Sequence, residues 1–219
     1  MSRGAGFVPA RAPSAGESSI VPVPSNPAIP GRGVVVAVAG SRSLPPTAAP
    51  LVSAVCQSIF TVPGRSLAVG CAVGVDAAVL TAGLSPATVR CFAAFGPVPK
   101  CAGSWSGSAR AAVSKHAAAG GSVAWFAGGD LVVPLRARLA GRTAAVIGAA
   151  SAGCVVFFTS PESRGTLLAT KLAITAGLPV WAFAIGFPWF LLPRPVSGIW
   201  TKPNQTVEGI WSSAVVWRT

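Results

Sequence analysis

The chain has 219 residues, which suits one domain with room for a short extra element, and 52% of them are hydrophobic, so a large core can form. Seventeen Lys and Arg residues against five Asp and Glu residues give a formal net charge of +12, which favours a polyanionic partner, either nucleic acid or an anionic membrane surface. A coding sequence rich in G and C would produce the same excess of Arg, Ala, Gly and Pro, and composition does not separate the two explanations. The five cysteines lack Cys-x-x-Cys spacing and have one histidine, His116, to join them, which argues against a zinc site.

Residues 1–33 are rich in Pro, Ser, Gly and Ala and cannot bury enough surface to fold alone, so we expect a flexible arm. From residue 34 to residue 186, apolar runs typical of buried strands alternate with segments of helical spacing. The predicted strands are 34–39, 66–69, 88–93, 122–126, 154–158 and 180–185, and the predicted helices are 47–60, 77–82, 108–119, 134–149 and 166–176. This alternation predicts one α/β domain, a mostly parallel sheet with helices on both faces.

The first predicted strand ends in Gly40, Ser41 and Arg42, ahead of a helix. A strand, a turn of small residues and a helix bring backbone N–H groups close to a phosphate. An arginine in that turn would add a charge-assisted hydrogen bond. We therefore interpret the turn as one side of a phosphate-binding site.

The second predicted strand leads into a tight turn with glycines at positions 70 and 74, after which Asp76 starts the next helix. Gly74 and Asp76 are candidate phosphate- or nucleotide-binding residues. As a helix cap, Asp76 needs no further role, and this is the favoured interpretation. A carboxylate at the carboxyl end of a strand would otherwise accept a hydrogen bond from a ribose or a base.

The helix predicted at 134–149 carries Arg136, Arg138 and Arg142. Arg138 and Arg142 are four residues apart and share one helix face. Few acidic residues are available to pair with these arginines, so we interpret them as anion ligands, with a solvated helix face as the alternative. His116, on the preceding helix, has no acidic or cysteine neighbour, and we expect neither a metal ligand nor a base there.

The stretch 153–186 is the one around which the rest of the chain is organised. Its continuous apolar run predicts a strand buried on both faces, and a polar loop then leads into a helix and a second buried strand. The loop places Ser163, Arg164, Gly165 and Thr166 at a helix N-terminus, where free N–H groups and the helix dipole favour an anion. We interpret this segment as a phosphate-binding loop.

Residues 187–219 form a Trp-rich tail. Gly-Ile-Trp occurs at 198–200 and again at 209–211, on either side of Lys-Pro-Asn-Gln, which predicts a β-hairpin. The tryptophans could stack on unpaired bases, pack on the edge of the sheet or form a dimer interface. We favour a packing role and expect a homo-oligomer.

The uncharged stretch 172–193 is long enough to cross a bilayer, but glycines and prolines interrupt it. We expect a buried strand with an apolar extension there, and no membrane span. The cysteines lie mostly in apolar runs, which is typical of core thiols in a reducing compartment, and residues 1–19 lack the apolar core of a secretory signal. We therefore expect a cytoplasmic protein.

Four motifs follow one another along the predicted elements. They are Gly-Ser-Arg at 40–42, Gly-x-Ala-x-Gly-Val-Asp at 70–76, Arg-x-Arg at 136–138 and Ser-Pro-Glu-Ser-Arg-Gly-Thr-Leu-Leu-Ala-Thr at 160–170. In this order they resemble the Rossmann-like superfamily (SLOG) that includes the DNA-processing protein A (Smf) family and the LOG phosphoribohydrolases, over residues 34–186. The last loop is most similar to that of the DNA-processing protein A family. The resemblance implies a pocket at the carboxyl ends of the strands that holds nucleotides or nucleic-acid phosphates.

The sequence departs from both families at three positions. LOG-type hydrolases carry a catalytic Glu where this chain has Ala169, so the resemblance implies no such hydrolase. Val73 stands where the DNA-processing protein A family has Arg, and Ala137 stands where it has Asn. We infer no catalytic residue and no cofactor, and Asp76, Asp130 and Glu162 are the only candidate general acids or bases between residues 34 and 186.

The sequence thus predicts a binding protein whose partner is nucleic acid, single-stranded in preference. Its phosphates would contact Arg42, Arg142 and Arg164, the hydroxyls of Ser41 and Thr166, and the backbone near Gly40 and Gly165, with Arg138 as a further ligand if its side chain reaches the pocket. One alternative is a sensor or enzyme that acts on a free nucleotide or nucleotide derivative in the same pocket. Another is a structural or assembly protein that uses the Trp-rich tail.

Overall fold

The computed structural model describes residues 35–97, 107–203 and 209–219, and its sheet has eight strands in the order β4-β3-β2-β1-β5-β6-β8-β7. The strands are β1 Val35–Gly40, β2 Ser66–Val69, β3 Val89–Phe92, β4 Ser122–Ala124, β5 Gly153–Phe158, β6 Val180–Ala184, β7 Ile199–Thr201 and β8 Val215–Arg218. Strands β1 to β6 pair in parallel, whereas β8 pairs antiparallel with both β6 and β7. The predicted mostly parallel α/β fold is confirmed.

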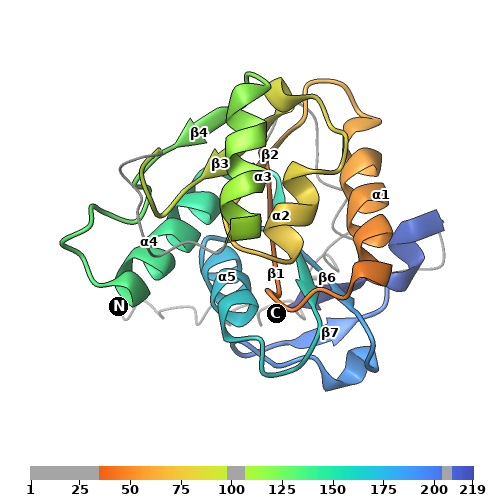
Figure 1. Ribbon diagram of the computed structural model, residues 1–219. Coiled ribbons are helices and arrows are strands. Elements are labelled where there is room, and N and C mark those ends of the chain that lie inside the picture. Colours follow the sequence, from red (N-terminus) through yellow and green to blue (C-terminus); the bar gives the residue numbers. More distant parts are fainter. Residues whose placement is uncertain (1–34, 98–106, 204–208) are drawn as a thin grey trace, which may run out of the picture.

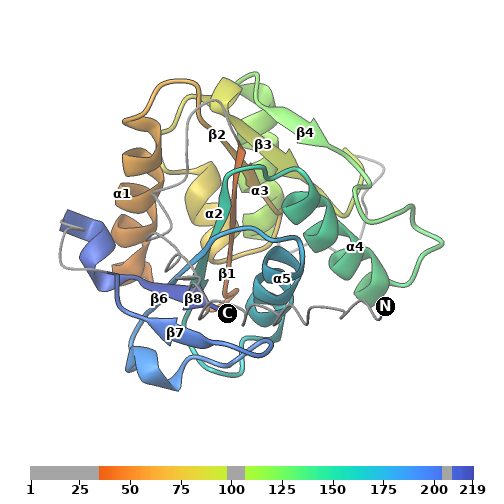
Figure 2. The ribbon, with the colours of Figure 1, turned by 180° about the vertical axis from the view of Figure 1, so that it is seen from behind.

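Helices cover both faces of this sheet (Figures 1 and 2). They are α1 Ala49–Phe60, α2 Val75–Leu80, α3 Gly107–Ala118, α4 Leu135–Gly148 and α5 Arg164–Thr175, and short 3-10 turns η1 to η4 lie at Pro46–Ala48, Pro86–Thr88, Trp189–Leu191 and Gly209–Ser213. Alternate residues of a strand point to opposite faces, so Val36 and Val38 of β1 pack with α1 and α2, and Ala37 packs with α4 and α5. Helix α3 packs beside α2. The central strands are therefore buried on both sides, as their apolar runs predict.

The C-terminal hairpin is built differently from the prediction. Strand β7 pairs with β8, and the predicted second strand at 209–211 lies in η4 instead. Trp211 explains the difference, because its ring is buried edge-on against Trp181 and its Nε1 donates to Ser58 Oγ at 3.0 Å. Residues 215–217, which carry two β-branched side chains and a tryptophan, form the strand. The predicted turn residues 204 and 205 lie outside the described residues, as does the arm at 1–33.

The tryptophans of the tail serve the fold. Trp200, Trp211 and Trp217 are 8%, 4% and 8% exposed, and the rings of Trp200 and Trp217 pack edge-to-face with their centroids 5.0 Å apart. Trp200 Nε1 also donates to Pro193 O at 3.0 Å. Because these rings are covered, the described tail supports the packing role and offers no base-stacking platform built from them.

The described cysteines are buried free thiols: Cys56, Cys71, Cys91 and Cys154. Burial raises the pKa of Cys56 and of Cys154 to about 12, so both are protonated core groups at neutral pH. Cys101 lies outside the described residues. Within the described ranges, no helix is both long and apolar enough to span a membrane.

Candidate functional site

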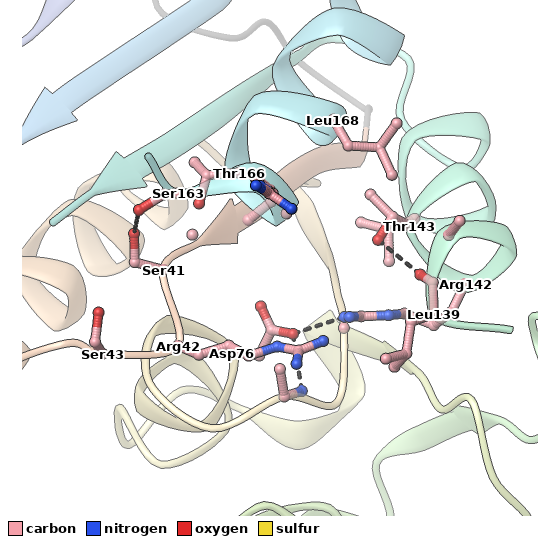
Figure 3. A pocket seen from close by; sticks show the side chains of 18 of the residues that line it. Ser41, Arg42, Ser43, Asp76, Leu139, Arg142, Thr143, Ser163, Thr166 and Leu168 are labelled. Atoms are coloured by element: carbon pink, nitrogen blue, oxygen red, sulfur yellow. Dashed lines mark hydrogen bonds and ion pairs between the residues drawn. The ribbon is translucent and has the colours of Figure 1, made fainter. Parts of the chain in front are cut away.

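The site lies where the strand order reverses. From β1 the chain adds β2, β3 and β4 on one side and then crosses to place β5 on the other side of β1. Open α/β sheets bind ligands at such a switch point, outside the carboxyl ends of the strands. A cavity of about 920 Å³ lies there, bordered by the loop after β1, the start of α5 and one face of α4 (Figure 3).

Hydroxyl groups fasten the loop after β1 to the loop after β5. Ser41 Oγ lies 2.6 Å from Ser163 Oγ and accepts a hydrogen bond from the Thr159 N–H at 3.0 Å. Ser43 Oγ and Thr159 Oγ1 are 3.0 Å apart. The sequence predicts Ser41 as a phosphate donor, but its hydroxyl is already engaged with β5 and its following loop, so its role in this structure is to hold the two loops together.

Two glycines of the site are required by close backbone approach. A Cβ on Gly40 would lie 2.5 Å from Val75 Cγ2 and 2.9 Å from Phe157 O. Gly74 has a φ of 77°, and a Cβ there would collide with the carbonyl oxygens of Ser41 and Arg42. Gly40 borders the cavity, whereas Gly74, which the sequence predicts as a site residue, is not among the residues that line it and instead lets α2 approach the loop after β1.

The start of α5 presents unused donors to the cavity. Ser163 is the N-cap residue, its side chain makes no capping hydrogen bond, and no acidic residue occupies the first turn. The first N–H that bonds back into the helix is that of Leu167, to Ser163 O at 2.9 Å, so the N–H groups of Arg164, Gly165 and Thr166 have no intrahelical acceptor.

Thr166 adds a second feature at the same place. Its side chain is 1% exposed, and its buried hydroxyl has no hydrogen-bond partner among the described residues, although the residue borders the cavity. A buried hydroxyl without a partner is costly. An anion at the start of α5 would supply the missing acceptor.

Asp76 and Arg142 form an ion pair at the bottom of the cavity (Figure 3). Arg142 Nη1 donates to Asp76 Oδ2 at 2.7 Å, with side chains 9% and 5% exposed, and the Ala72 N–H donates to the same oxygen at 2.9 Å. Burial disfavours the charge of Arg142, but the Asp76 carboxylate outweighs it, so the pKa of Arg142 lies above its usual range.

This pair changes two interpretations made from the sequence. Asp76 is not the helix cap, because Gly74 occupies that position and Asp76 lies within the first turn of α2. Arg142 does border the cavity, but it has an acidic partner 66 residues away. Gly70, which sequence reasoning left out of the site, makes the pair possible, since a Cβ there would collide with Arg142 Nη1 and Asp76 Oδ2.

Arg138 lies outside the cavity lining and serves the fold. Its Nε donates to Val133 O at 3.0 Å, its Nη1 donates to Ala94 O at 3.3 Å, and its guanidinium lies 5.1 Å from the centroid of the Phe95 ring. Arg138 and Arg142 do share one helix face, but Arg142 borders the cavity whereas Arg138 contacts the loop after β3. Arg136 borders the cavity instead and is exposed.

The cavity is rimmed mainly by positive charge. Arg42, Arg136 and Arg164 are exposed at its border, and Glu162 is the carboxylate on that rim. In the described part of the chain, Asp76–Arg142 is the ion pair that forms, so the rim arginines keep their charge available to a ligand. No cluster of three His, Cys, Asp or Glu side chains suited to a metal ion occurs among the described residues.

The reversal point, the open start of α5 and the basic rim thus lie together at one edge of a mostly parallel α/β sheet. No protein-family model matches the chain, and no curated protein is significantly similar to it in sequence. A solved structure of DNA processing protein A from Helicobacter pylori, described as binding single-stranded DNA, is similar in fold, with a TM-score of 0.54 at 15% identity. The match covers 70% of this chain and 66% of that protein, slightly less than two thirds of its length.

Proposed function

We propose that this protein binds single-stranded nucleic acid and holds its phosphates between the loop after β1 and the start of α5. The observation that carries the proposal is the start of α5, where N–H groups without an intrahelical acceptor border the cavity and the hydroxyl of Thr166, a residue of the cavity lining, is buried without a partner among the described residues. Helix N-termini bind phosphates through such N–H groups and the helix dipole. Arg42 and Arg164 lie at the same border, and arginines form strong paired hydrogen bonds with phosphate oxygens.

Two further observations favour a polymer over a single small ligand. The net charge of +12 would strengthen binding to each additional phosphate by releasing counterions. The similar structure from Helicobacter pylori is of a protein described as binding single-stranded DNA. The likeness to that structure is one of fold, so its ligand enters here as support for a hypothesis.

The second candidate is a protein that binds a free nucleotide or nucleotide derivative in the same cavity. A volume of about 920 Å³ lies within the usual range of small-molecule pockets and exceeds what one phosphate needs. Both candidates use the same phosphate contacts. They differ because the affinity of a nucleic-acid-binding protein should grow with the number of phosphates in the ligand, whereas the affinity of a nucleotide-binding protein should not.

A salt titration of oligonucleotide binding tests the proposal. The full chain would be compared with Arg42→Ala plus Arg164→Ala, and with the matched control Arg110→Ala plus Lys115→Ala, which removes two exposed charges from α3. If each of the first two arginines neutralises one phosphate, the slope of log affinity against log salt should fall by about 1.4. The control should retain its slope.

Three outcomes separate the candidates. Steep, length-dependent binding that drops in the Arg42 and Arg164 variant supports the proposal. Binding that is equally reduced in both double variants moves the contact away from the cavity and contradicts it. Binding of nucleoside monophosphates with no gain from longer strands would replace the polymer with a free nucleotide.

A further inference from the structure

Several apolar side chains line the side of the cavity opposite the hydroxyl groups of Ser41, Ser163 and Thr166. Leu135, Leu139 and Val146 of α4 border it, as does Leu168 of α5. In Figure 3, Leu139 and Leu168 lie across the cavity from Ser41, Ser163 and Thr166. Leu135 is 42% exposed, which is a large apolar surface to leave open at the border of a basic site. A phosphate gains nothing from such a wall, whereas an apolar part of a ligand would gain from covering it.

The floor of the cavity offers an unused acceptor beside an arginine that makes a single described side-chain hydrogen bond. The two oxygens of Asp76 are unequal, because Oδ2 accepts both described hydrogen bonds and Oδ1 accepts none from the described residues. Figure 3 shows the second oxygen turned away from Arg142. Arg142 binds Asp76 through Nη1, and its Nε has no partner in the described structure. The ion pair is thus monodentate, and both Asp76 and Arg142 retain hydrogen-bonding capacity.

The chemistry of this floor excludes a second phosphate. The Asp76 carboxylate would repel an anion, whereas its free oxygen requires a group that donates. Arg142, held in its charged form by Asp76, requires an acceptor. The edge of a nucleobase presents a donor and an acceptor side by side, and carboxylates and arginines are side chains that read such edges. The flat faces of a base are also suited to an apolar wall.

We propose that the cavity takes one complete nucleotide unit, with an unpaired base between the leucines of α4 and α5 and its edge hydrogen-bonded to Asp76 Oδ1 and Arg142. This inference rests on the proposed phosphate site at the start of α5 and adds a base subsite to it. A base that is paired in a duplex has its pairing edge occupied. The subsite therefore also accounts for a preference for single strands.

The experiment compares two single strands of equal length and phosphate number, one with bases and one made of abasic units. For the full wild-type chain we expect the strand with bases to bind about tenfold more tightly, the value of one good hydrogen-bonded base contact. Asp76→Asn can keep an oxygen for Ala72 and Arg142 while it replaces the free oxygen with an amide donor. We expect this variant to reduce the tenfold ratio to about two or to change which base is preferred.

A second variant, Leu135→Ser, tests the base subsite independently in case Asp76→Asn impairs folding. Leu135→Ser alters an exposed side chain, and it should lower the same affinity ratio by about threefold through lost apolar contact. Arg110→Ala, on α3, is the control and should leave the ratio at its wild-type value.

The outcomes distinguish this inference from the proposed function. Equal binding of the two strands by the wild type, or ratios unchanged in both variants, would overturn the base subsite and leave the phosphate site in place. In contrast, Arg42→Ala plus Arg164→Ala should weaken both strands to a similar extent. If neither strand binds to the wild type, the proposed function fails, and the base subsite fails with it.

Discussion

Helices α2 and α5 begin at the same edge of the sheet, but only α2 has a carboxylate in its first turn. At the start of α2, the Val75 N–H donates to Ser41 O at 3.2 Å, and Asp76 places a carboxylate in the first turn. The first turn of α5 has no acidic residue and no side-chain cap, and it contains a buried threonine hydroxyl without a partner among the described residues. Negative charge stabilises a helix N-terminus. The chain therefore supplies a carboxylate to the first turn of α2, and we propose that a bound phosphate does the same for α5.

The difference separates residues that hold the fold from residues that hold the ligand. Asp76 neutralises the start of α2 and fixes Arg142, so its removal should damage stability first. Arg164 and Thr166 have no comparable partner within the described residues, so their removal should affect binding while stability is kept or improved.

The largest effect is expected for Asp76→Ala. This change leaves the buried Arg142 guanidinium without its acidic partner, and we expect the free energy of unfolding to fall by about 3–5 kcal/mol. Urea denaturation measures it, with Asp130→Ala, at an exposed position, as the control. A loss no larger than that of the control would show that the start of α2 does not depend on its own carboxylate.

Arg138→Ala and Arg164→Ala should have opposite effects, the first on stability alone and the second on strand binding alone. Arg138→Ala removes charged hydrogen bonds to Val133 O and Ala94 O, and we expect it to lower the free energy of unfolding by about 1.5–3 kcal/mol without changing the salt slope of strand binding. Arg164→Ala should reduce that slope by about 0.7 and change stability by less than about 0.5 kcal/mol. The comparison breaks down if Arg138→Ala also changes the slope, because Arg138 would then contact phosphate.

Substitution by alanine should change the free energy of unfolding in opposite directions at Gly70 and Gly165. Gly70→Ala places a methyl group against Arg142 and Asp76, and we expect a loss of about 1–3 kcal/mol in the free energy of unfolding. Gly165→Ala, in the first turn of α5, meets no atom within 4 Å and should raise stability by up to about 1 kcal/mol. Thermal unfolding of both variants gives the signs directly, and equal losses would contradict the account of the two helix starts.

Much of the architecture was predictable because its signals are local. The apolar runs of β1, β5 and β6 predict strands buried on both faces. The polar and small residues of the loop at 160–166 predict the start of α5. The family resemblance also implies that the turn at 40–42 and the loop at 160–166 face each other at the carboxyl ends of the strands. The hydrogen bond between Ser41 and Ser163 shows that these loops do meet.

The remaining features depend on contacts between distant residues. Whether Asp76 caps a helix or binds Arg142 is decided by a partner 66 residues away, and no local pattern reveals it. Arg138 and Arg142 share a helix face, but the loop that covers Arg138 comes from β3. In the tail, the sequence predicts a strand at 209–211, but the burial of Trp211 against Trp181 places that segment in η4, and β8 forms at Val215–Arg218 instead.

The measurement that tests the central claim most directly is made on Thr166→Val, a change of nearly equal volume, with Thr170→Val as its control one turn later. Thr170 is also buried, but its hydroxyl donates to Thr166 O at 2.8 Å. We expect Thr166→Val to raise the free energy of unfolding of the unliganded protein by about 1 kcal/mol, because the Thr166 hydroxyl has no partner in that state. The same change should weaken single-strand binding about tenfold, because the hydroxyl would donate to the bound phosphate. Thr170→Val should lower stability and leave affinity unchanged. Unchanged affinity in Thr166→Val would contradict the assignment of the phosphate site to the start of α5.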